Sequence, residues 1–87
     1  MRHNAFGDAY CHSVDDVDTI MAKNDIYYGD IHAEVYLDEE NPGMWMAEVR
    51  YNEDGDTAFW CENFADKEAL FTALMATGMT RKDITIT

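Results

Sequence analysis

Residues 30–64 read DIHAEVYLDEENPGMWMAEVRYNEDGDTAFWCENF, three runs typical of β-strands separated by two turn sequences. In residues 30–37 and 44–51, apolar side chains alternate with mostly polar ones, the period of two that a strand with one covered face shows. The sequences NPG and DG between the runs favour turns, so we expect an antiparallel meander with one face covered and the other exposed to water. Residues 57–64 carry aromatic side chains on both faces, and the sequence does not assign a buried face to this run.

Helices are expected before and after the meander. Ser13 is a candidate N-cap with Asp16 in the capping-box position, and apolar residues at helical spacing continue to Asn24, which suits a left-handed cap. A second helix is expected from Asp66, its candidate N-cap, through about Thr77.

Short strands complete the predicted layout. Residues 83–87 alternate and are rich in β-branched side chains, which favours a final edge strand, and residues 9–12 are a candidate leading strand. The length of 87 residues suits one domain. The predicted fold class is therefore α+β: a single acidic domain over residues 1–87, with an antiparallel sheet of three to five strands and two helices on one face, in the order α-β-β-β-α-β.

Acidic side chains dominate the chain and concentrate in its middle. The sequence has 18 acidic and 6 basic residues, a net charge of −12 at pH 7, and Arg50 is the sole lysine or arginine between Asp25 and Asp66. Such a charge repels nucleic acid and anionic membranes and attracts basic surfaces, so we expect no direct binding to nucleic acid or membrane. With 47% hydrophobic and 13% aromatic residues, the chain has the composition of a folded domain and not of a disordered acidic tail.

The predicted strands bring part of this acid to one surface. Two glutamates fall on the exposed faces of neighbouring strands, and the turns at 38–40 and 53–56 border the sheet. Carboxylates spaced over such a surface imitate a nucleic-acid duplex, which carries about one negative charge per 1.7 Å of axis. An exposed aromatic residue is a candidate anchor at the centre of the interface. The predicted partner-binding residues are Glu34, Asp38, Glu39, Glu40, Glu48, Glu53, Asp54, Asp56, Tyr36 and Trp45.

In size, charge and layout, the chain resembles the small acidic inhibitors that bacteriophages encode, anti-CRISPR proteins among them. Residues 44–87 are also similar in layout to small phage inhibitors of host RNA polymerase. The resemblance implies a non-enzymatic DNA or RNA mimic that occupies the nucleic-acid-binding site of a basic host or defence protein, such as a nuclease or CRISPR effector, with no cofactor and no metal. It rests on architecture and charge and assigns no functional residue.

Two other functions remain open. The first is an immunity protein or antitoxin that neutralises a basic nuclease toxin through the same electrostatics. The second is a small thiol- or metal-dependent enzyme that uses Cys11, His12, His32 and Cys61, although no zinc spacing or glycine-rich elbow accompanies these residues.

The predicted compartment is the cytoplasm, and the host cytoplasm if the protein is phage-encoded. The N-terminal residues contain no apolar run of a signal peptide, so the two cysteines are expected to be free thiols. A monomer and a homodimer paired through the edge strand at residues 84–87 are both compatible with the sequence.

Overall fold

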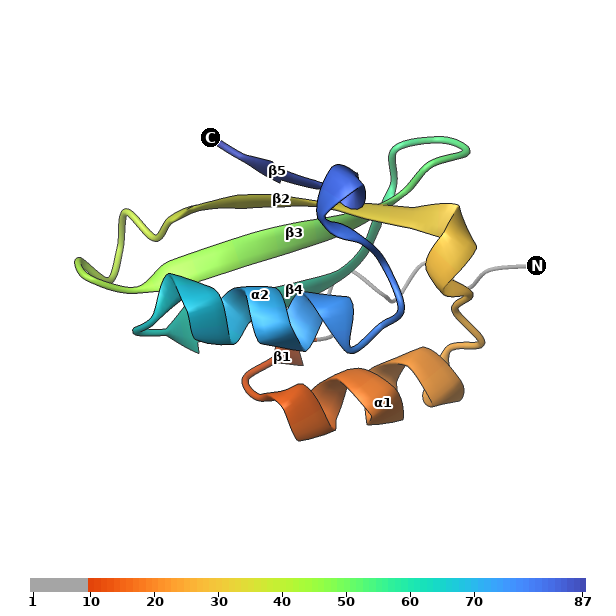
Figure 1. Cartoon of the computed structure of the whole chain (residues 1–87), viewed down its shortest axis with the longest axis horizontal. Coiled ribbons are helices and arrows are strands. Elements are labelled where there is room, and N and C mark those ends of the chain that lie inside the picture. The colour runs from red at the N-terminus through yellow and green to blue at the C-terminus, as the bar shows by residue number, and fades with distance from the viewer. Residues whose placement is uncertain (1–9) are drawn as a thin grey trace.

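The computed structural model describes residues 10–87, in which five strands form one sheet and two α-helices lie on the same side of it (Figure 1). Short 3-10 turns precede the second and the last strand. The elements, in chain order, are β1 (Tyr10–Cys11), α1 (Val14–Lys23), η2 (Tyr28–Asp30), β2 (Ile31–Leu37), β3 (Trp45–Tyr51), β4 (Thr57–Phe64), α2 (Lys67–Met75), η3 (Arg81–Asp83) and β5 (Ile84–Ile86).

The sheet is mixed, with the strand order β1-β4-β3-β2-β5. The central strands β2, β3 and β4 form the predicted antiparallel meander, whereas β1 pairs with β4 in parallel and β5 pairs with β2 in parallel. The prediction of an antiparallel sheet is therefore confirmed for the meander and wrong for both edges. Each edge strand is joined to the meander through a helix, and such a crossover returns the chain in the parallel direction. The candidate leading strand is present as β1, which gives an α+β domain of order β-α-β-β-β-α-β.

Both predicted N-cap residues precede a helix, but only that of α2 makes the expected capping hydrogen bond within the described residues. The Asp66 carboxylate accepts a hydrogen bond from the backbone N–H of Glu68 at 3.0 Å, so the expected cap of α2 is confirmed. Ser13 occupies the N-cap position of α1, but its side chain makes no capping hydrogen bond within the described chain. The Asp16 carboxylate accepts instead from the backbone N–H of His12 at 3.0 Å, so the expected capping box is wrong.

The helix ends depend on residues with positive φ. At the end of α1, Asn24 has φ −104°, and the left-handed conformation falls on Asp25 with φ 54°, contrary to the sequence prediction. After α2, Gly78 takes φ 106°, and a Cβ at this position would lie 2.8 Å from a ring carbon of Tyr28. Gly78 is therefore required both by its backbone conformation and by its neighbour. Within residues 10–87, neither helix has the length and apolar character that crossing a bilayer requires.

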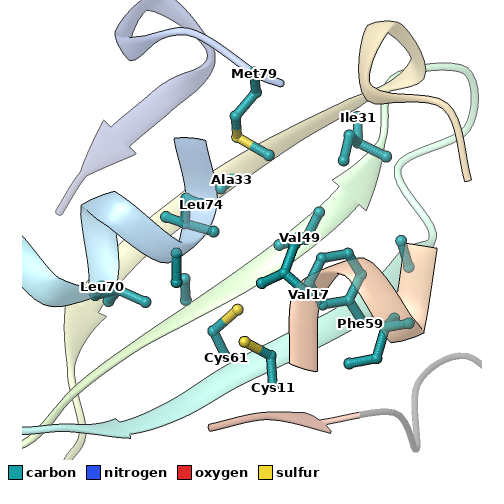
Figure 2. Packing of buried hydrophobic residues seen from close by; sticks show 14 of the residues in the cluster. Cys11, Val17, Ile31, Ala33, Val49, Phe59, Cys61, Leu70, Leu74 and Met79 are labelled. Atoms are coloured by element: carbon teal, nitrogen blue, oxygen red, sulfur yellow. The ribbon is translucent and has the colours of Figure 1, made fainter. Parts of the chain in front are cut away.

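The core fills the space between the helices and one face of the sheet (Figure 2). Val17 from α1 and Leu70 and Leu74 from α2 are fully buried there, together with Val49 of β3 and Phe59 of β4. Because side chains alternate along each strand, every second residue of the sheet points away from this core. That opposite side is called the open face below.

Candidate functional site: the open face of the sheet

Residues that pair across the five strands form one row of side chains over the whole open face. From edge to edge, the row consists of Tyr10, Trp60, Glu48, Glu34 and Thr85. Neither α1 nor α2 covers these residues, because both helices pack against the other side of the sheet. The row is aromatic at the β1 edge and acidic over β3 and β2, so the open face combines two kinds of recognition chemistry.

The two glutamates predicted on the strands lie directly opposite each other and are bridged by Arg50. Glu34 and Glu48 are register partners, an arrangement that destabilises a sheet when both are charged and uncompensated. Arg50 Nη2 donates to Glu48 Oε1 at 2.7 Å, and Arg50 Nε lies 3.6 Å from Glu34 Oε1. Thr57 Oγ1 donates to the second carboxylate oxygen of Glu48. Glu48 is 8% exposed and presents little surface to a partner, whereas Arg50 and Glu34 are partly exposed.

The three acidic residues of the β2–β3 turn have two different roles. The Asp38 carboxylate accepts hydrogen bonds from the side-chain amide of Asn41 at 3.0 Å and from the backbone N–H of Glu40 at 2.9 Å. These bonds, the Asn41 side chain first, hold the pKa of Asp38 below its ordinary value. Asp38 therefore organises the turn, whereas Glu39 and Glu40 present exposed charge at this end of the sheet.

The β3–β4 turn places a second acidic group at the opposite end (Figure 1). Glu53, Asp54 and Asp56 are all exposed, and the Asp56 backbone N–H donates to Asp54 Oδ1 at 3.0 Å. The two turns are separated by the seven residues of β3, which at ~3.3 Å per residue corresponds to about 23 Å. The predicted acidic surface thus consists of two charged ends joined by the Arg50 cluster.

A shallow groove of about 380 Å³ lies on the open face beside the β2–β3 turn. Aromatic and methionine side chains from β1, β2, β3 and β4 line it, together with carboxylates and an amide from the turn and β4. Burial and the nearby Glu48 carboxylate raise the pKa of Tyr36, so its hydroxyl stays protonated and can donate a hydrogen bond. The lining residues are Tyr10, Tyr36, Met46, Trp60, Asp38, Glu39, Glu40, Asn41 and Glu62.

The structure separates the two aromatic anchors predicted from sequence. Tyr36 lies on the open face in the groove, whereas Trp45 lies on the helix side, packed against the core with Lys67 Nζ 5.2 Å from its ring centroid. Trp45 therefore does not belong to the open face. Tyr10 and Trp60, which sequence reasoning did not select, take its place beside Tyr36.

Irregular pairing in β4 explains why its faces were not assigned from sequence. A step of one residue on β3, from Val49 to Arg50, corresponds to a step of two on β4, from Phe59 to Thr57. A second irregularity lies farther along β4, where Asn63 has φ 66°. Each extra residue reverses the face on which the following side chains lie, so a strict period of two fails along this strand.

The four residues of the enzyme hypothesis are not gathered into one cluster. Cys11 and Cys61 are register partners in the core, and both are fully buried. His12 is exposed with its ring nitrogen 3.1 Å from the Asn63 side-chain amide, and His32 contacts Asn52 on the open face. Within residues 10–87, no group of three or more histidine, cysteine or acidic side chains is placed to hold a metal ion.

Comparisons with family models, with curated proteins and with solved structures each found no match to this chain. The function is therefore argued from the geometry and the charge of the open face.

Proposed function

We propose that this protein is a non-enzymatic inhibitor that binds a basic nucleic-acid-handling protein and competes with DNA or RNA for its binding site. The observation that carries the proposal is the groove of the open face, whose lining combines aromatic side chains with carboxylates. The net charge of −12 supports it, because a strongly negative chain associates with positive surfaces and is repelled by nucleic acid itself.

The groove suits an arginine side chain of the partner. A guanidinium group stacks on aromatic faces such as those of Trp60 and Tyr10, and it pairs with carboxylates through fixed hydrogen-bond donors. Glu39 and Glu40 of the turn and Glu62 of β4 supply carboxylates to the lining of the groove. Arginine is also a side chain with which nucleic-acid-binding proteins hold phosphates, so the groove would engage a group that otherwise binds DNA or RNA.

The acidic β3–β4 turn would extend the contact with the partner beyond the groove. The separation of about 23 Å between the turns corresponds to roughly seven nucleotide steps of 3.4 Å, a length over which a basic channel tracks a nucleic-acid strand. Glu53, Asp54 and Asp56 would then meet basic residues beyond the groove, where their main contribution is to the rate and orientation of encounter.

Affinity capture from a host lysate at low salt tests the proposal. The expected result is a basic nucleic-acid-binding protein that is released by moderate salt and displaced by added DNA or RNA. Capture should fail with Trp60→Ala, while Trp45→Phe, a conservative change on the helix side, should leave it unchanged. A captured protein that is indifferent to both salt and nucleic acid would contradict the proposal.

The same capture distinguishes the alternative function. A nuclease whose gene lies beside the gene of this protein would identify an immunity protein or antitoxin. A CRISPR effector or another host defence or polymerase component would support a phage-type inhibitor.

A further inference from the structure

Two buried thiols lie side by side in the core, away from the open face. Cys11 of β1 and Cys61 of β4 are register partners, and both have 0% exposed surface. Figure 2 shows their sulfur atoms directed toward each other. Neighbouring strands lie roughly 4.7–4.9 Å apart, which falls within the Cα separations of about 4.4–6.8 Å that disulfides span.

We infer that Cys11 and Cys61 form a reversible disulfide that locks β1 onto the sheet. In the dithiol state the Cys61 thiol donates a hydrogen bond to the Cys11 sulfur, and the single S–H of Cys11 donates to the backbone oxygen of Ser13 at 3.1 Å. The pair is thus already aligned for bond formation without rearrangement of the meander. This inference is independent of the proposed binding function, because it needs no partner protein.

The two thiols have different roles in the reaction. The hydrogen bond from Cys61 lowers the pKa of Cys11, whereas the same contact and burial raise the pKa of Cys61 well above its ordinary value. Cys11 also lies on the two-residue edge strand β1, so it is the thiol that becomes accessible when this strand opens and the one that attacks as the thiolate. Cys61 is the resolving thiol that closes the bond.

Glutathione disulfide is a sufficient oxidant for this step. The Cys11 thiolate attacks one sulfur of glutathione disulfide, which forms a mixed disulfide and expels one glutathione thiolate. Cys61 then loses its proton and attacks the Cys11 sulfur, which expels the second glutathione thiolate. The two protein thiols are oxidised, one glutathione disulfide is reduced to two glutathione thiols, and these take up the two protons.

Strand β1 controls access to the pair and links it to the groove. It is two residues long and lies at the edge of the sheet, and such short edge elements open at low free-energy cost. Cys11 follows Tyr10, whose register partner is Trp60. A disulfide between residues 50 positions apart would therefore fix the aromatic wall of the groove as well as the strand.

The test is equilibration of the whole chain in glutathione buffers of increasing disulfide fraction, followed by acid quenching, alkylation in denaturant and mass spectrometry. We expect the dithiol chain to convert into a monomeric chain with no free thiol, without accumulation of the mixed disulfide. The oxidised chain should keep its circular dichroism spectrum and melt about 5–15 °C higher than the reduced one. The Cys61→Ala control should stop at the reduced chain or the mixed disulfide and show no such rise.

Both thiols are expected to react once urea, at a concentration below the global unfolding transition, opens β1. Retention of both thiols in fully oxidised buffer under that condition would overturn the inference. A disulfide between two chains, a stable mixed disulfide in the unmodified chain, or an intramolecular bond that forms only after global unfolding would also overturn it.

Discussion

Replacing Arg50 by methionine should destabilise the sheet by about 2–3 kcal/mol. Its charge-assisted hydrogen bond to Glu48 at 2.7 Å belongs to a class worth about 1.5–3 kcal/mol, and the partly exposed contact to Glu34 at 3.6 Å adds about 0.2–1 kcal/mol. The Arg50 side chain is 37% exposed, which screens both contacts and places the expected total below the sum of the upper limits. Methionine keeps the apolar stem of the side chain, so the loss reports the removed guanidinium contacts, including its hydrogen bond to the Gly55 backbone oxygen at 3.3 Å, and not a lost volume.

Urea unfolding followed by tryptophan fluorescence measures this loss. With a slope of about 1–1.5 kcal/mol per molar for a domain of this size, the midpoint should fall by roughly 1.3–3 M. A second change, Glu48→Gln, should restore at least half of the loss in the Arg50→Met background, because an unpaired buried carboxylate costs more than the absence of the pair. An Arg50→Met variant that loses less than about 0.5 kcal/mol, or a double variant whose loss equals the sum of the single losses, would refute the role assigned to this cluster.

Three further predictions concern stability. Gly78→Ala should cost about 1–3 kcal/mol in urea unfolding, because its φ of 106° disfavours a side chain and the new Cβ would meet the Tyr28 ring; a cost no larger than that of Gly43→Ala, where nothing lies within 4 Å, would contradict the clash. The lowered pKa of Asp38 means that its contribution is present above the ordinary value of about 3.9 and is lost as pH falls through the lower folded value, so Asp38→Asn should flatten the acid side of the stability profile. Raising sodium chloride from about 0.05 to 0.5 M should raise the melting temperature, because salt screens the repulsion of the −12 chain; a constant or falling value would show that local ion pairs outweigh it.

The sequence predicts the meander well because local signals agree there. Alternation in residues 31–37 and 45–51 and the turns between the strands define three neighbouring strands and the faces of the first two. The same signals do not predict whether the edge strands pair in parallel or antiparallel. The direction in which β1 and β5 pair depends on the helical crossovers and not on the residues of these short strands.

The candidate site is predictable only in part, for two physical reasons. First, a count of charges does not show which carboxylates are used internally: Asp38 caps a turn and Glu48 is held by Arg50, although both look like surface acid in the sequence. Second, the bulges of β4 break the period of two, so Trp60 was not recognised as an aromatic residue of the open face. The two bulges of β4 leave only a weak trace in a single sequence, because neither extra residue, Ala58 or Asn63, identifies a bulge by its residue type alone.

The most direct test of the central claim is the affinity of the captured partner for two charge-neutralised variants of equal net charge. One variant carries Glu39→Gln, Glu40→Gln and Glu62→Gln around the groove. The matched control carries Asp15→Asn, Asp18→Asn and Glu68→Gln on exposed positions of the two helices. Binding through the open face predicts that the first variant loses about tenfold or more in affinity, with a smaller salt dependence, while the control stays within about twofold of the unmodified chain. An equal loss in both variants would show that net charge alone governs binding, and no loss in the groove variant would contradict the proposed site.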